Sequence, residues 1–144
     1  MKKLNQYTQT GVFLLIWVLI GSGFSAYSAE PTEQPIGVVE IVIRNSTFEF
    51  HGGILKPDQP AAIVIHNQDQ LTHGFTSTLL ADFDVQVESN GVTTMGKGIK
   101  GVHIDPGKTV RISFLPNRPG KFAFQCDIHP KMKGEFLLLS IESI

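Results

Sequence analysis

The sequence predicts an all-β fold, an antiparallel β-sandwich or a small barrel, and three observations lead to this prediction. Apolar and polar residues alternate in several short runs, as expected of strands that bury one face. Turn sequences rich in Gly, Pro, Asn and Asp separate these runs. No run of useful length has the period of a helix. Short, closely spaced strands in about 115 residues are typical of sandwiches and small barrels.

The first 29 residues are predicted to be a secretory signal peptide. Two lysines near the start precede an apolar run, residues 12–21, and small residues follow it. The run has roughly ten residues, whereas about 20 are needed to span a bilayer. Cleavage near Ser28 or Ala29 is therefore expected, with no stable membrane insertion afterwards, and an uncleaved N-terminal anchor is the alternative. Residues 30–37 then form a tether and residues 38–144 the domain of a periplasmic or otherwise exported protein.

Four runs are predicted to be strands with one buried face; they cover residues 38–45, 61–67, 109–116 and 121–126. A fifth run, residues 135–143, is apolar on both faces, which predicts a central strand. Residues 79–103 are less regular, but an Asn90-Gly91 pair lies between two alternating runs. This segment is predicted to form a hairpin and a loop at one edge of the sandwich.

Charge and cysteine usage restrict the function. Beyond the first 29 residues the chain holds 10 Lys and Arg against 13 Asp and Glu, and so mild a balance argues against nucleic acid as a partner. The chain has one cysteine, so it cannot form an internal disulfide. An unpaired thiol in an oxidising compartment is a liability unless something binds it.

The stretch "CDIHPKM" indicates that a metal ion binds this thiol. It spaces Cys126, His129 and Met132 evenly on one short loop between two strands. Zinc sites do not use thioether ligands, whereas copper in a trigonal His₂Cys site with a weak axial Met matches this set. One histidine is missing from the loop. His73, just beyond the run 61–67, is favoured, His51 and His103 are the alternatives, and His66 is interpreted as a surface strand residue.

From Glu40 to Ile141 the pattern resembles the cupredoxins, the small blue copper proteins. The matching pieces are "FEF", "IVIHNQDQLTHGF", "IDPGKTVRISF" and "GKFAFQCDIHPKMKGEFLLL". The resemblance implies a Greek-key β-sandwich that binds one copper ion. It also implies His73 and His129 as equatorial ligands, Cys126 as the thiolate and Met132 as the axial ligand. The short spacing of this loop is similar to that of amicyanin-type members rather than plastocyanin-like ones.

Three neighbours of the ligands are predicted to tune the site. Pro130 holds His129 in an extended backbone. Gly74 stands where the family often has an Asn whose side chain clamps the copper loop, although its N–H can still reach the Cys126 sulfur. Asp127 stands where many members have Ser or Thr, and groups around the ligands tune the potential.

The closed ligand set leaves no position for a substrate, which predicts an electron carrier cycling between Cu(I) and Cu(II) and not an enzyme. An oxidase or nitrite reductase needs a further copper site and a second domain. The alternative is a copper chaperone or storage protein, but such proteins tend to be Met-rich or His-rich, and beyond its first residue this chain has only two methionines. The expected partner of the monomer is an exported redox protein, such as a c-type cytochrome, an oxidase or a reductase, docking transiently near His129.

Overall fold

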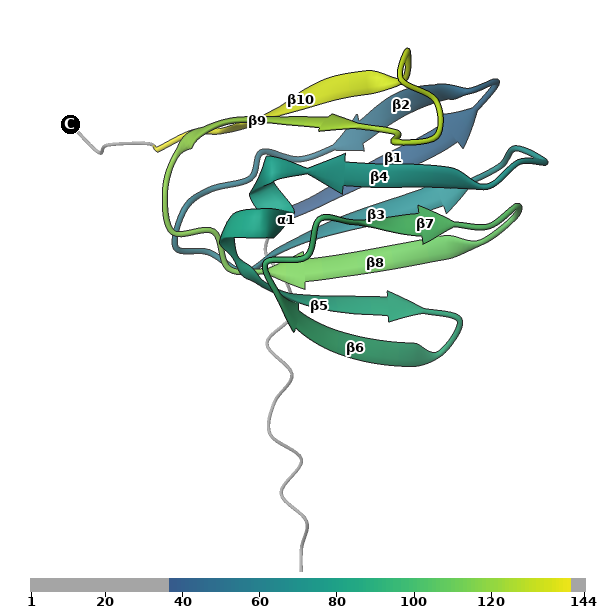
Figure 1. Ribbon diagram of the computed structural model, residues 1–144. Coiled ribbons are helices and arrows are strands. Elements are labelled where there is room, and N and C mark those ends of the chain that lie inside the picture. The colour runs from purple at the N-terminus through teal and green to yellow at the C-terminus, as the bar shows by residue number, and fades with distance from the viewer. Residues whose placement is uncertain (1–36, 141–144) are drawn as a thin grey trace, which may run out of the picture. The chain divides into compact units, whose positions relative to one another are not determined.

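The computed structural model describes residues 37–140, which form a sandwich of two β-sheets (Figure 1). The strands of the six-stranded sheet run in the order β2-β1-β3-β8-β5-β6, and those of the four-stranded sheet in the order β10-β9-β4-β7. The predicted all-β sandwich is confirmed. The predicted signal peptide, its cleavage site and all of the tether except Gly37 lie outside the described residues.

The elements along the chain are β1 (Gly37–Arg44), β2 (Thr47–Gly52), β3 (Ala61–Asn67), β4 (His73–Ser77), α1 (Thr78–Asp82), β5 (Asp84–Ser89), β6 (Val92–Lys97), β7 (Gly101–Ile104), β8 (Thr109–Phe114), β9 (Gly120–Gln125) and β10 (Lys133–Leu138). Within residues 37–140, none of the helical structure has the length and apolar character that a membrane span requires.

The antiparallel prediction holds for all neighbouring strands except one pair. β1 and β3 run parallel, with Val39 beside Ile63 and Ile41 beside Ile65. The reason is the hairpin between them in sequence: β2 returns along one side of β1, so the chain begins β3 from the same end as β1, on its other side. Asn45 and Ser46 make the tight β1–β2 turn with φ of 51° and 52°, the left-handed backbone that a two-residue hairpin requires.

The predicted alternation is confirmed, because the inner residues of the four alternating runs form one core between the sheets. These residues are Val39, Ile41, Ile43, Ala61, Ile63, Ile65, Val110, Ile112, Phe114, Phe122, Phe124 and Cys126. Aromatic contacts join the sheets, since the ring of Phe124 on β9 lies 5.3 Å from that of Phe48 on β2. Phe124 is also 4.7 Å from Phe136 on β10. Phe124 lies two positions before Cys126 in the sequence, so this aromatic cluster supports the end of β9.

The prediction that the last strand is central is wrong. β10 lies at an edge of the four-stranded sheet and pairs with β9. Leu138 is 1% exposed, whereas Leu137 is 50% exposed. The exposed Leu137 made the sequence apolar on both faces of this strand, although only the inner face is buried in the core.

The predicted hairpin in residues 79–103 is confirmed. β5 and β6 pair through a turn at Asn90 and Gly91, both with positive φ, and β6 is the edge of the six-stranded sheet. Most of the short helix α1 and the start of β7 also fall in this segment, and the sequence predicted neither. The Ser77 hydroxyl caps α1 by accepting the Leu79 N–H at 3.2 Å.

We expect Leu138→Ala to lower the free energy of unfolding by about 2–5 kcal/mol, because the substitution empties a buried position. Leu137→Ala on the same strand should change it by less than about 0.5 kcal/mol, since this side chain is half exposed. Urea unfolding of the metal-free protein measures both values, and equal costs would contradict the burial of only one face of β10.

Candidate metal centre

Three of the predicted ligands meet at one end of the sandwich. His73 begins β4, Cys126 directly follows β9, and His129 lies on the β9–β10 loop. Each offers a ligand atom, and these atoms all lie within 4.8 Å of one another. Cys126 and His73 are fully buried, whereas His129 is partly exposed. Among residues 37–140, these three side chains form the one group of His, Cys and carboxylate side chains close enough to hold a metal ion.

Strand pairing explains why residues far apart in sequence meet here. β4 and β9 are neighbours in the four-stranded sheet (Figure 1), with Thr76 beside Gln125 and Ser77 beside Phe124. Because the strands are antiparallel, the beginning of β4 lies next to the end of β9. His73 and Cys126 occupy those two ends.

The Cys126 sulfur is held from two sides by backbone N–H groups. Gly74 donates to it at 3.2 Å and His129 donates at 3.3 Å. The His129 Nδ1 atom lies 3.6 Å from the same sulfur. The predicted donation from Gly74 is thus present, and the position of the sulfur is determined by β4 and by the β9–β10 loop together.

His73 has one ring nitrogen engaged and one free. Its Nε2 lies 2.9 Å from Asp69 Oδ2, whereas its Nδ1 is buried and has no hydrogen-bond partner among the described residues. With the proton on Nε2, as the carboxylate favours, Nδ1 carries a lone pair. A buried imidazole lone pair without a partner is the arrangement of a metal ligand.

Asp69 is a site residue that sequence reasoning missed. Its carboxylate also accepts the N–H groups of Asn45 at 2.7 Å and Ser46 at 2.8 Å, in the β1–β2 turn. The N–H of Ser46 is the main cause that holds the pKa of Asp69 below its ordinary value of 3.8, and His73 contributes in the same direction. The only signal in the sequence was an acid four residues before the histidine.

Asn67 holds the loop between β3 and His73. Its side-chain amide donates to the carbonyls of Leu71 and Ile104, each at 2.8 Å, and its oxygen accepts the Asp69 N–H at 3.0 Å. Asn67 is itself buried. The loop therefore presents Asp69 and His73 in a determined geometry.

The β9–β10 loop closes on itself. The Cys126 N–H donates to the Met132 carbonyl at 3.0 Å, and the Met132 N–H donates to the His129 carbonyl at 2.9 Å. Met132 is buried, and Pro130 is exposed. The axial role of Met132 and the stiffening role of Pro130 stay predictions.

The other histidines have different surroundings. His66, on β3, lies 2.8 Å from Glu40 and 2.8 Å from Thr109, and His51 is exposed on β2. His103, on β7, pairs with Asp127 at 2.9 Å. The hydrogen bond from His103 is the main cause that lowers the pKa of Asp127. These three histidines stand outside the cluster of His73, Cys126 and His129.

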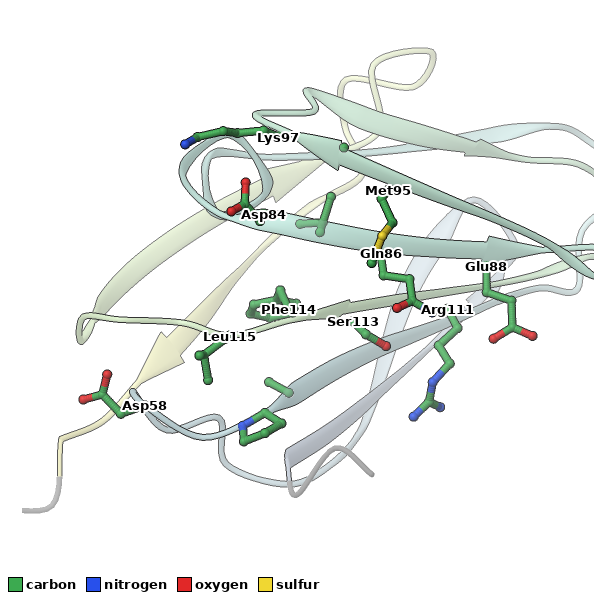
Figure 2. Close-up of a pocket in the computed structure, with 14 residues that line it drawn as sticks. Asp58, Asp84, Gln86, Glu88, Met95, Lys97, Arg111, Ser113, Phe114 and Leu115 are labelled. Atoms are coloured by element: carbon green, nitrogen blue, oxygen red, sulfur yellow. The ribbon is translucent and has the colours of Figure 1, made fainter. Parts of the chain in front are cut away.

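A broad hollow lies elsewhere, on the outer face of the six-stranded sheet (Figure 2). The side chains that line it include Gln86, Glu88, Met95 and Arg111, from β5, β6 and β8. No histidine or cysteine lines it. This hollow therefore shares no residue with the cluster of His73, Cys126 and His129.

A family model described as a cupredoxin-like domain matches residues 11–138. The chain belongs to this family. A search of curated proteins found no match.

Solved structures share the fold of this cupredoxin-like domain. A copper nitrite reductase from Nitrosomonas europaea matches 80% of the chain and 52% of its own, with 12% identity and a TM-score of 0.53. A laccase from Pediococcus acidilactici matches 78% of the chain and 28% of its own, with 16% identity and a TM-score of 0.56. A multicopper oxidase from Campylobacter jejuni, a metallo-oxidase, matches 76% and 31%, with 13% identity and a TM-score of 0.53. The chain thus spans about half or less of these proteins.

The prediction that the protein is not an enzyme is wrong, because the solved neighbours of its fold are oxidases, a laccase and a nitrite reductase. The prediction rested on the closed ligand set of one domain, whereas these enzymes are longer chains. The cupredoxin-like domain and its His–Cys–His cluster support a copper-binding, redox-related protein.

We expect Asp69→Asn to lower the free energy of unfolding at neutral pH by about 1–3 kcal/mol, because an amide accepts weaker hydrogen bonds than a carboxylate. The pKa of Asp69 is lowered on folding. Its stabilising contribution is therefore complete above the ordinary value and is lost as the pH falls through the lowered pKa.

In urea unfolding, the difference between the wild type and Asp69→Asn should accordingly narrow below about pH 4. Asp84→Asn, at the exposed start of β5, is the control and should leave stability nearly unchanged. A difference that stays constant through the acid range would contradict the role of the Asp69 charge.

Proposed function

We propose that this protein holds one copper ion and transfers single electrons, with His73, Cys126 and His129 as strong ligands and Met132 as a weak axial one. The observation that carries the proposal is the buried His73 Nδ1 without a partner, in a cluster whose ligand atoms lie within 4.8 Å of one another. Two imidazoles, one thiolate and a thioether are a copper set rather than a zinc set.

The residues around the ligands support rapid electron transfer, because they limit ligand motion. Asp69 orients the His73 ring, and two N–H groups hold the Cys126 sulfur. A bound copper ion would supply the one-electron couple between Cu(II) and Cu(I). Ligands that are held by their surroundings rearrange little when the charge at the site changes.

His129 offers the approach for a partner, since it is the partly exposed member of the cluster. Ile128 on the β9–β10 loop and Leu71 on the loop before His73 are exposed apolar residues. A small apolar surface of this kind suits weak, transient docking. We propose an exported redox protein, such as a c-type cytochrome, an oxidase or a reductase, as the partner of a monomer, with export itself resting on the predicted signal peptide.

The comparisons favour a second candidate, in which this domain is the mononuclear copper site of an oxidase or reductase. Its support is that the solved neighbours of the fold are such enzymes and are longer than this chain. Turnover separates the two candidates. Oxidase or nitrite reductase activity of the copper-loaded chain would support the enzyme, and reversible one-electron reduction without such activity would support the electron carrier.

The full chain loaded with Cu(II) should show an intense visible absorption from the bond between thiolate and copper. Cys126→Ser and His73→Ala should each abolish it, because each removes a strong ligand. His66→Ala is the matched control and should leave the spectrum intact, since His66 lies outside the cluster. A colourless copper complex of the wild type, or loss of the colour in His66→Ala, would refute the assignment.

Electron transfer and copper delivery differ in what leaves the protein. As an electron carrier, the copper-loaded chain should be reduced and reoxidised repeatedly without losing its metal to a competing chelator. Voltammetry, followed by metal analysis after incubation with a Cu(I) chelator, measures both properties. Rapid release on reduction would instead support a chaperone or storage protein.

A further inference from the structure

The loop that carries Cys126, His129 and Met132, residues 126–132, is called the ligand loop here. It begins where the pairing between β4 and β9 has ended, at Thr76 and Gln125. Its other hydrogen bonds are internal or involve the Cys126 sulfur. Within the described part of the chain, a single side-chain hydrogen bond joins residues 127–132 to another element, and it runs from His103 on β7 to Asp127.

The position of the Asp127 side chain depends on residue 74 being glycine. Gly74 on β4 lies opposite His103 on β7. A Cβ atom added to Gly74 would overlap the Asp127 carboxylate, lying 2.9 Å from its Cγ atom and 3.2 Å from His103 Cδ2. The Asp127 side chain therefore passes over Gly74 to reach His103, with Oδ2 2.9 Å from Nε2. Any larger residue at position 74 would displace it.

These observations connect the two positions at which the sequence departs from the pattern that it resembles. Gly74 has no side chain with which to hold the ligand loop, as the sequence predicted. The space above it is filled by Asp127, which makes the connection to the neighbouring strand from the other side. His103, which bonds to Asp127, was predicted only as an alternative ligand.

We infer that Asp127 and His103 form a positioning pair that clamps the ligand loop to β7 across Gly74 and thereby limits the motion of Cys126 and His129. Both side chains are substantially exposed, at 43% and 58%, and an exposed ion pair contributes little to global stability. The effect of the pair is therefore local to the ligand loop. Its influence on a bound copper ion rests on the proposed function, whereas its influence on the loop does not.

Amide hydrogen exchange of the metal-free full chain, followed by NMR, tests the clamp directly. His103→Ala and Asp127→Ala should each speed exchange at the Cys126, His129 and Met132 amides, by about two- to fivefold for a surface pair. The double variant should show no larger effect than either single variant, because both remove the same bond. His103→Gln, which keeps a side-chain N–H donor, should retain much of the protection.

His66→Ala is the matched control, since His66 is also a histidine on a strand that pairs with an exposed carboxylate, Glu40. It should leave exchange in the ligand loop unchanged. Unchanged exchange in His103→Ala, additive effects in the double variant, or an equal effect of His66→Ala would overturn the inference.

A steric test examines the overlap itself. Gly74→Ala should lower Tm, and adding Asp127→Ala should restore part of the loss, because it removes the carboxylate that the new methyl group meets. Absence of any restoration would refute the described geometry.

In the copper-loaded protein, His103→Ala should shift the reduction potential and the visible spectrum, whereas His66→Ala should not. If the chain proved to bind copper without transferring electrons, the proposed function would fail while the exchange result still decided the clamp. Loosened exchange without any shift in potential or spectrum would overturn the effect on the metal.

Discussion

The Cys126 sulfur depends on donors from two separate parts of the chain, and this requirement governs the site. Gly74 reaches it from β4 and His129 from the ligand loop. Both donors are available only because β4 and β9 are neighbours and the chain turns sharply after Gln125. The aromatic cluster around Phe124 packs beneath this junction and supports it. The core of the sandwich and the geometry of the metal centre are therefore linked.

Two carboxylates surround the cluster and do different work. Asp69 is mostly buried and joins the His73 ring to the β1–β2 turn. Asp127 is more exposed and joins the ligand loop to β7. Each couples one ligand to an element that carries no ligand itself. Negative charge so close to the site would favour the more highly charged oxidation state of a bound metal.

Membership of the cupredoxin-like family leaves the biological role open, because fold and function are separable. The same sandwich is part of oxidases and reductases that are longer than this chain. A closed ligand set in one domain is compatible with a separate electron carrier and with the mononuclear site of a larger enzyme. Turnover of an oxidase or reductase substrate is the property that separates these two roles.

The sequence by itself determined most of the strands and the loop that holds Cys126 and His129, because each depends on short-range order. Alternation of apolar residues specifies which face is buried, and the spacing of Cys126, His129 and Met132 is set within one loop. Only the tertiary structure decided which strands are neighbours, that β10 is an edge and that β1 and β3 run parallel. It also brought Asp69 and His103 to the site. Their contacts join loops that are distant in sequence, and neither periodicity nor motif spacing encodes such pairs.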